Sequence, residues 1–154
     1  MKKDYAFWIF LTEAVGLLAG LLTRNSTQIY SMEIVQPPLS PPAILFPIVW
    51  TVLYALMGVS AARVDAAEPS ADRTRGLKLW GLQLAVNFFW SIIFFNFQAF
   101  GFAFLWLVLL WVLILWMIRV FYRVDPVAAW LQVPYLLWVT FAGYLNLAVY
   151  RLNP

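Results

Sequence analysis

The chain has 154 residues, of which 64% are hydrophobic and only 11% are charged, and its mean hydropathy is +0.82. A soluble domain carries about 25% charged residues, so this chain lacks the charge to cover a water-facing surface, and composition predicts an integral membrane protein. The net charge of +3 is too small to suggest a nucleic-acid partner. The chain has no cysteine or histidine, which removes thiolate chemistry, the commonest general base and the commonest metal ligand, so we expect no metal site.

Five stretches are long and apolar enough to cross a bilayer, which takes roughly 20 mostly apolar residues. In chain order, the sequence predicts transmembrane helices at about residues 5–23, 43–63, 75–97, 101–122 and 126–150. Lys2 and Lys3 precede the first stretch as they would in a signal peptide, but no clear small-x-small cleavage site follows, so we expect a retained helix. The expected fold is all-α: one domain, residues 1–154, forming a bundle of five transmembrane helices with a long first loop.

Two of the predicted helices have clear start signals. Asp125-Pro126 opens the fifth helix, with Asp as the N-cap and Pro at the first helical position. Pro41-Pro42 is expected to open the second helix in a similar way.

Two further prolines, Pro47 and Pro134, fall inside predicted spans. Each lacks an N–H group, so we expect a kink at both positions. The first loop, residues 24–40, is the longest connection, and a short helix can form in it around residues 30–34.

The distribution of Lys and Arg predicts how the chain is oriented in the membrane. Eight of these ten residues fall at the N-terminus, between helices two and three, or near the turn between helices four and five: Lys2, Lys3, Arg63, Arg73, Arg75, Lys78, Arg119 and Arg123. Arg24 and Arg151 fall on the other side. The positive-inside rule therefore places the N-terminus in the cytoplasm and the first loop outside, which suits a bacterial cell membrane.

Glu13 is the one carboxylate well inside a predicted span, and an intramembrane acid is a functional candidate by default. It shares a helix face with Gly16 and Gly20, and a Gly-x-x-x-Gly pair lets another backbone approach closely. The simpler interpretation is a protonated carboxyl group that bonds across this contact. Gly81-x-x-x-Ala85 in the third helix is a similar but weak pattern and a candidate dimer face.

The third predicted helix carries polar side chains on one face. Gln83, Asn87 and Trp90 recur at i, i+4 and i+7 inside a run, residues 79–118, that contains no charged residue. An amide at that depth needs a partner because water is not available. The residues alone leave two interpretations, a hydrogen bond that joins helices or a polar contact in a ligand cavity.

Matching faces occur in the second helix, with Trp50, Tyr54 and Met57, and in the fifth, with Tyr135, Trp138, Ala142 and Asn146. Aromatic walls with a few convergent polar groups are typical of a small-molecule pocket. For any single Trp, the alternative is core packing or anchoring at the lipid interface. Trp106, Trp111 and Trp116 in the fourth helix are spaced by five, so we assign them to packing or lipid contact.

Three segments together, "SPPAILFPIVWTVLYALMG", "QLAVNFFWSIIFF" and "VPYLLWVTFAGYLNLAVYRLN", resemble the signature segments of the TspO/MBR family. That family comprises the tryptophan-rich sensory proteins and the mitochondrial translocator protein, and the resemblance covers essentially the whole chain. It implies a five-helix bundle, usually dimeric, with a pocket beneath the first loop. It also implies binding of porphyrins, such as protoporphyrin IX and haem, and of benzodiazepine-site ligands.

Carried over by motif, the resemblance implies that the ligand is bound by Trp50, Tyr54, Gln83, Asn87, Trp90, Tyr135, Trp138, Ala142 and Asn146. The Trp50 and Trp138 positions are also linked, in bacterial members, to light-dependent breakdown of porphyrin, which would make them catalytic. The sequence departs from the family pattern where Leu39, rather than Trp, precedes Ser40-Pro41-Pro42. The sterol motif is imperfect as well, because Leu147 occupies its tyrosine position, so strong sterol binding is not predicted.

The leading hypothesis is a membrane receptor for porphyrins, acting in tetrapyrrole transport or stress regulation. The alternative is an enzyme that degrades bound porphyrin in light, which needs no acid–base machinery and so suits a chain without His or Cys. No catalytic triad, P-loop or dinucleotide fingerprint is present. A third hypothesis is a scaffold or regulator whose ligand only stabilises the bundle. We expect no obligatory cofactor, with porphyrin as a ligand, and the bilayer and a second copy of the chain as partners.

Overall fold

The computed structural model describes residues 4–153, and within that range every regular element is a helix. The helices are α1 (Tyr5–Glu33), α2 (Leu45–Asp65), α3 (Ala71–Ser91), the π-helix η1 (Ile92–Asn96), α4 (Phe100–Val124), α5 (Pro126–Leu131) and α6 (Val133–Leu152). Five helical segments of this described range are long and apolar enough to cross a membrane: Tyr5–Glu33, Leu45–Asp65, Ala71–Asn96, Phe100–Val124 and Pro126–Leu152. The predicted all-α, five-span membrane fold is confirmed.

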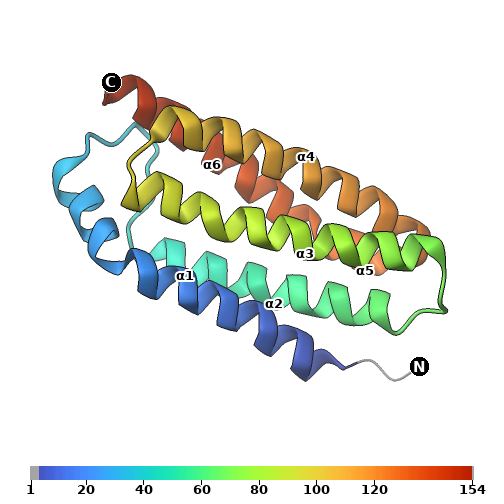
Figure 1. The fold of residues 1–154 in the computed structure, drawn as a ribbon. Helices are drawn as coiled ribbons and strands as arrows, with labels where there is room; N and C mark the ends of the chain where they lie inside the picture. Colours follow the sequence, from blue (N-terminus) through green and yellow to red (C-terminus); the bar gives the residue numbers. More distant parts are fainter. Residues whose placement is uncertain (1–3, 154) are drawn as a thin grey trace.

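The helices form an elongated bundle in which successive spans run in opposite directions (Figure 1). The first loop, which in the structure is residues 34–44, lies at the same end as the C-terminus, and we call this the first-loop end. The second loop, residues 66–70, lies at the opposite, second-loop end. α1 packs along α2, α4 packs along both α3 and α6, and α5 lies between α2 and α4.

The centre of the bundle is filled by α2 and α4. Met57, Ala61, Ile114, Met117 and Phe121 are completely buried there. Many large apolar side chains on the outside are exposed instead, as a lipid-facing surface requires; they include Leu17, Leu18, Phe102 and Leu105.

α1 is longer than the sequence predicts. It runs without a break to Glu33, so the expected end near residue 23 and the separate short helix after it are wrong. No Pro or Gly occurs from residue 21 to residue 36, so nothing in the sequence stops the helix. The added turns are held by packing, because the ring of Tyr30 lies 5.4 Å from that of Phe94.

The start of α2 differs from the prediction. α2 begins at Leu45, so Pro41-Pro42 lie in the first loop and do not open the helix. Pro47 then falls in the first turn, where backbone N–H groups have no partner inside the helix. The kink expected at Pro47 is therefore wrong, and α2 is continuous to Asp65.

The fifth span is interrupted near Pro134, as predicted. Gln132 ends α5 and precedes α6, because Pro134 cannot donate to a carbonyl group one turn earlier. The predicted N-cap of this span is confirmed as well. The Asp125 Oδ1 atom accepts hydrogen bonds from the backbone nitrogens of Val127, at 3.0 Å, and Ala128, at 3.3 Å.

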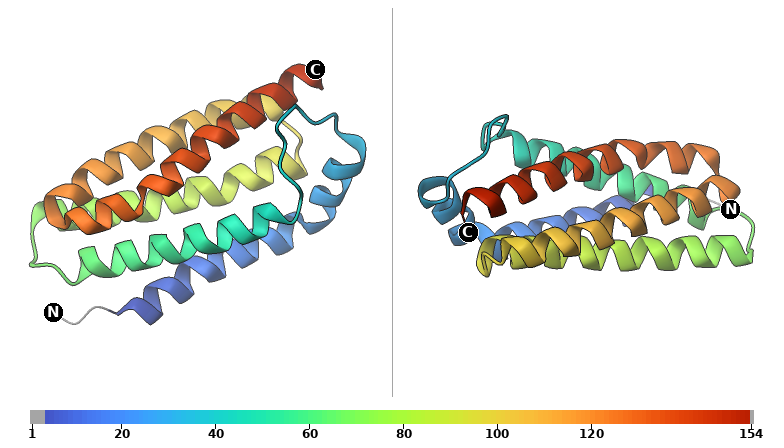
Figure 2. Two further views of the ribbon diagram at one scale, coloured as in Figure 1. Left: turned by 180° about the vertical axis from the view of Figure 1, so that it is seen from behind. Right: turned by 90° about the horizontal axis from the view of Figure 1, so that it is seen from above.

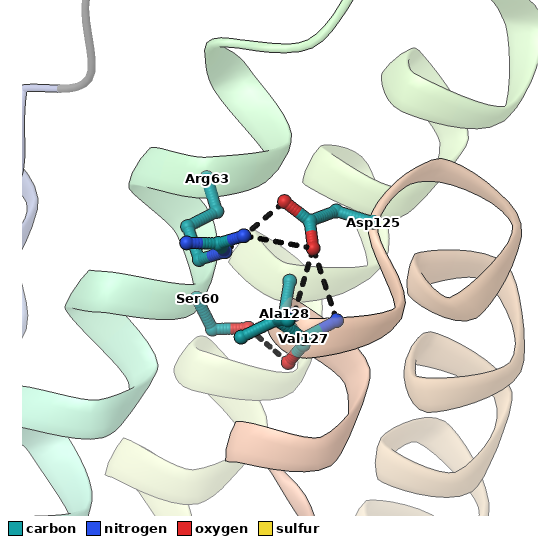
Figure 3. Close-up of polar contacts among 5 residues, drawn as sticks. All are labelled: Ser60, Arg63, Asp125, Val127 and Ala128. Carbon is teal, nitrogen blue, oxygen red and sulfur yellow. Dashed lines mark hydrogen bonds and ion pairs between the residues drawn. The ribbon is translucent and has the colours of Figure 1, made fainter.

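Two further contacts fix α5 to α2 at the second-loop end (Figure 3). The Arg63 Nε atom lies 3.0 Å from the Asp125 Oδ2 atom, so the residue that caps α5 also forms an ion pair with α2. Nearby, the Ser60 hydroxyl donates to the carbonyl oxygen of Ala128 at 2.7 Å. The second-loop ends of α2 and α5 are thus held together at two points.

The close contact of α1 with α2 depends on a glycine that the sequence analysis did not single out. A Cβ atom built on Gly58 would lie 2.6 Å from the Cα atom of Ile9. The predicted contact at Gly16-x-x-x-Gly20 holds only for Gly16, which faces the ring of Tyr54. A Cβ atom on Gly20 would meet nothing within 4 Å.

Glu13 does not make the predicted bond across this contact. Within residues 4–153 its side chain has no hydrogen-bond partner, and the preceding residue takes that role. The Thr12 hydroxyl is fully buried and donates to the backbone carbonyl oxygen of Tyr54 at 2.6 Å. Adjacent residues on a helix point about 100° apart, so only one of the two can face α2.

Candidate ligand-binding site

Buried polar side chains of three helices form one hydrogen-bonded chain. The Tyr54 hydroxyl of α2 donates to the Asn87 Oδ1 atom at 3.0 Å. The Asn87 Nδ2 atom donates to the Tyr135 hydroxyl oxygen of α6 at 2.7 Å, and that hydroxyl donates to the Gln83 Oε1 atom at 2.6 Å. The Gln83 Nε2 atom completes the chain by donating to the carbonyl oxygen of Trp80 at 3.0 Å.

All four of these side chains are buried, and each is satisfied by its neighbours. The chain joins α2, α3 and α6, which is the helix-joining role that the residues alone allowed for Gln83 and Asn87. Their role as ligand contacts stays a prediction. A ligand could use the two amides only by replacing one of these bonds.

Aromatic rings from α2 and α6 meet beside this chain. The ring of Trp50 lies 5.5 Å from Tyr54, 6.3 Å from Tyr135 and 6.5 Å from Trp138. The last two pairs are edge-to-face, an arrangement that aromatic rings favour. Spacing predicted these faces, and the structure brings them together. Phe46, whose ring lies 5.8 Å from Trp138, was missed although it precedes Trp50 by four residues on the same face.

Trp90 and Asn146 belong to a second group, nearer the first-loop end. The Trp90 Nε1 atom donates to the Asn146 Oδ1 atom at 3.0 Å, and the Asn146 amide donates to the carbonyl oxygen of Phe100 at 2.8 Å. The Trp90 ring stacks on Phe94, with centroids 5.1 Å apart. Phe94 lies in η1, whose wider turn was not predicted, because no residue in it signals a π-helix; such turns often occur at functional sites. Ala142 is half-buried against the core between the two groups.

The first loop is fastened to α6. The backbone N–H of Val35 donates to the Asn153 Oδ1 atom at 3.0 Å, and the Asn153 amide donates back to the Val35 carbonyl oxygen at 2.8 Å. The Tyr144 hydroxyl donates to the carbonyl oxygen of Pro38 at 2.8 Å. Leu39, also in the first loop, is 78% exposed.

The tryptophans of α4 lie apart from these groups, as their spacing predicts. The Trp106 Nε1 atom donates to the carbonyl oxygen of Val86 at 2.8 Å, and the Trp111 Nε1 atom donates to the Thr140 hydroxyl oxygen at 2.9 Å. Trp106 and Trp111 therefore hold α4 to its neighbours. Trp116 is half-exposed on the outer surface.

The chemistry that this arrangement offers is neutral. The two groups supply aromatic faces, indole N–H groups, phenol hydroxyls and amides, and none of the predicted site residues carries a charge. Within residues 4–153, no three His, Cys, Asp or Glu side chains are placed to hold a metal ion. Such a site suits a flat, largely apolar molecule with a few polar atoms.

Two surface hollows lie elsewhere. One of about 700 Å³ is lined by α3 and α4 near the second loop, and one of about 300 Å³ is lined by α4 and α6. Neither is lined by any of the predicted site residues. The aromatic rings that meet between α2 and α6 are packed against one another.

The sequence matches a model of the TspO/MBR family over residues 8–151. The chain is similar to "Tryptophan-rich protein TspO" of Chlorobaculum tepidum, with 38% identity over 150 residues, 97% of this chain and 95% of that protein. It is 43% identical to "Protein CrtK" of Rhodobacter capsulatus over 120 residues, 77% of this chain and 75% of that protein. It is 30% identical to "Translocator protein" of Bos taurus over 140 residues, 90% of this chain and 83% of that protein.

Proposed function

Because the chain belongs to the TspO/MBR family, we propose that it is a membrane receptor for porphyrins, such as protoporphyrin IX and haem, and for benzodiazepine-site-type ligands. The observation that carries this proposal is the meeting of Trp50, Tyr135 and Trp138 beside the buried amides of α3. The macrocycle would stack on the indole rings. Asn87 and Gln83 would supply polar contacts to the ligand, which would replace one of the hydrogen bonds that these amides make inside the protein.

The ligand would enter where α2 and α6 diverge. α2 packs on α5 toward the second-loop end, whereas α2 and α6 separate toward the first-loop end (Figure 2). Only side chains such as Trp50 and Trp138 bridge them there, so a flat ring could insert by parting those rings. We propose that the macrocycle lies deep in the bundle and that its carboxylates point toward the first-loop end. Arg24 of α1 and Arg151 of α6 are cations at that end.

The test is porphyrin affinity of Trp50→Phe, Trp138→Phe and Asn87→Ala proteins. Binding should be followed by the porphyrin's own absorption and emission, so that loss of an indole does not change the signal. Each variant should lose about 0.5–1.5 kcal/mol, the value of one aromatic contact or one hydrogen bond, or roughly two- to tenfold in Kd. Trp130→Phe is the matched control, because Trp130 is 67% exposed near the opposite end. Unchanged affinity in all three variants would refute this site.

A second candidate function is light-dependent oxidative degradation of bound porphyrin, with dioxygen as the oxidant. It is favoured by the pairing of Trp50 and Trp138, whose ring centroids are 6.5 Å apart. The test is illumination of porphyrin-saturated protein, followed by the Soret absorption. If the Trp50→Phe/Trp138→Phe double variant bleaches porphyrin as fast as the unmodified protein, these residues are not catalytic.

The proposed location is a bacterial cell membrane, with the N-terminus in the cytoplasm. Arg63, Arg73, Arg75, Lys78, Arg119 and Arg123 all lie toward the second-loop end, which supports this orientation; Lys2 and Lys3 lie outside the described residues. The chain has no cysteine, so single substitutions report topology directly. A membrane-impermeant maleimide should label Leu39→Cys in intact cells but Glu68→Cys only after lysis, and the reverse pattern would refute the orientation.

The proposed homodimer would use the exposed face of α3 at Gly81 and Ala85. A Cβ atom on Gly81 would meet nothing within 4 Å, so a second helix can approach closely there. Gly81→Leu should shift the protein toward the monomer in light scattering, whereas Gly20→Leu, at the other open glycine, should not. A dimer that survives Gly81→Leu must use another face.

A further inference from the structure

The larger surface hollow, of about 700 Å³, has two different halves. Toward the second loop it is lined by polar side chains, among them Thr74, Arg75 and Lys78. Farther along the helices it is lined by Leu79, Leu82 and Trp116. We call this hollow the α3–α4 groove.

The cations of the groove are available to a ligand. Within residues 4–153, Lys78 has no ion-pair partner. Arg75 pairs with Asp72 at 3.4 Å, but the Arg75 side chain is 51% exposed, and Asp72 is shared with Arg123 at 3.8 Å. Exposed pairs of this kind are weak, so the arginine can exchange its partner for a stronger anion.

The depth of these residues matches the boundary between water and lipid. Lys78 lies seven residues after the start of α3, or about 10 Å along the helix axis. Trp116 lines the same groove from α4, and tryptophan is enriched at membrane interfaces. Leu82 lies one turn farther from the second loop than Lys78 and is half-exposed, so it is available to an acyl chain. The groove is therefore cationic at headgroup depth and apolar at acyl-chain depth.

We propose that the α3–α4 groove binds one anionic phospholipid. Arg75 and Lys78 hold the phosphate group, and an acyl chain lies along Leu79 and Leu82 against the ring of Trp116. Paired basic residues beside an apolar surface between transmembrane helices are the chemistry that retains acidic lipids. The groove shares no residue with the proposed porphyrin site, so the two sites can be tested separately. Lys78 lies on the same face of α3 as Ala85, so lipid retention should also be measured on Gly81→Leu, which separates it from the proposed dimer contact.

Native mass spectrometry of the protein taken from mixed phosphatidylglycerol and phosphatidylcholine nanodiscs tests the proposal. The unmodified protein should retain one phosphatidylglycerol in preference to phosphatidylcholine. Lys78→Gln and Arg75→Gln should each weaken that retention about fivefold, since a basic residue near the surface contributes about 1 kcal/mol. Lys78→Arg should keep it. Arg151→Gln, at the opposite end, is the control for overall charge.

Three results would overturn the proposal. The first is equal retention of phosphatidylcholine, which would make the groove an ordinary lipid contact. The second is an equal loss with Arg151→Gln, which would indicate a general charge effect. The third is displacement of the bound lipid by millimolar inorganic phosphate together with no effect of Leu82→Ser, which would indicate a free-anion site. Circular dichroism spectra and porphyrin affinity unchanged from the unmodified protein verify that each variant is folded.

Discussion

The hydroxyl oxygen of Tyr135 lies 2.7 Å from the amide nitrogen of Asn87, in a place where neither group is open to water. The same hydroxyl donates its proton to Gln83 at 2.6 Å. One phenol of α6 therefore satisfies two amides of α3. A buried polar group in a membrane protein cannot hydrogen-bond to water instead, so leaving it unpaired costs free energy. This phenol should therefore be important for stability.

Removing the Tyr135 hydroxyl should lower the free energy of unfolding more than removing the Tyr54 hydroxyl. Tyr135→Phe leaves both the Asn87 amide nitrogen and the Gln83 oxygen unpaired, at about 1–3 kcal/mol for each group. Tyr54→Phe leaves only the Asn87 oxygen unpaired. Thermal unfolding in detergent should rank the proteins as unmodified, Tyr54→Phe, Tyr135→Phe in falling order. The reverse order for the two variants would show that the network is not as the structure describes.

A methyl group at Gly58 should separate α1 from α2. The Cβ atom of Gly58→Ala would lie 2.6 Å from the Cα atom of Ile9, and backbone atoms cannot move aside cheaply. We expect a loss of about 1–3 kcal/mol in the free energy of unfolding. Gly20→Ala is the control, because that position is open and Ala favours a helix by up to about 1 kcal/mol. Equal effects of the two changes would contradict the close approach.

Gln132 is completely buried between α5 and α6, and within residues 4–153 neither of its side-chain amide atoms has a hydrogen-bond partner. Gln132→Met keeps the length of the side chain and removes the polar atoms. The variant should unfold at a higher temperature, because its free energy of unfolding should rise by about 1 kcal/mol or more. A destabilised Gln132→Met protein would instead indicate that an ordered water pairs with the amide.

Loss of the Asn153 amide should free the start of the first loop. Asn153→Ala removes both of its bonds to the Val35 backbone. Hydrogen exchange at residues 34–36 should become faster, because the Val35 N–H loses its acceptor. Asn25→Ala is the control, because Asn25 is exposed and lies in the half of α1 that leads into the first loop. It should leave the exchange unchanged. If Asn153→Ala has no effect, Tyr144 and Pro38 hold the loop by themselves.

The ion pair between Arg63 and Asp125 should show measurable coupling. Both side chains are largely buried, at 23% and 17% exposure, so the pair is less screened than one on the surface. In a double-mutant cycle with Arg63→Gln and Asp125→Asn, we expect a coupling energy near 1 kcal/mol. Asn still accepts the capping bonds of α5, so the cycle isolates the charge. Additive effects would mean that the pair contributes nothing.

The spans could be predicted because the absence of charge over about 20 residues has few explanations other than a membrane. Their ends could not, because tertiary contacts decide them. α1 continues past Arg24 because the ring of Tyr30 packs against that of Phe94. Phe94 is more than 60 residues away in the sequence, so this contact could not be predicted from local pattern. The initial turn of α2 could be placed only once its backbone was known, so Pro47 was misjudged.

The candidate site shows the same division. Helical spacing selected Trp50, Asn87, Tyr135 and Trp138, and these residues do converge from three helices. Spacing does not say which polar atom pairs with which, and so Glu13 was credited with a contact that Thr12 makes. The interhelical approach at Gly58 gives no pattern in sequence either, because a lone glycine in a helix has no partner to define a motif.

The length of α1 has a mechanical consequence. Its 29 residues measure about 43 Å, while the hydrocarbon core of a bilayer is about 30 Å thick, so the helix is longer than the core by about 13 Å. The first loop begins directly at the end of this long, unbroken helix. A tilt of only a few degrees at the second-loop end would move Glu33 by about 4 Å, given the rise of an α-helix. Because α1 is unbroken, any change in its tilt would also displace the start of the first loop.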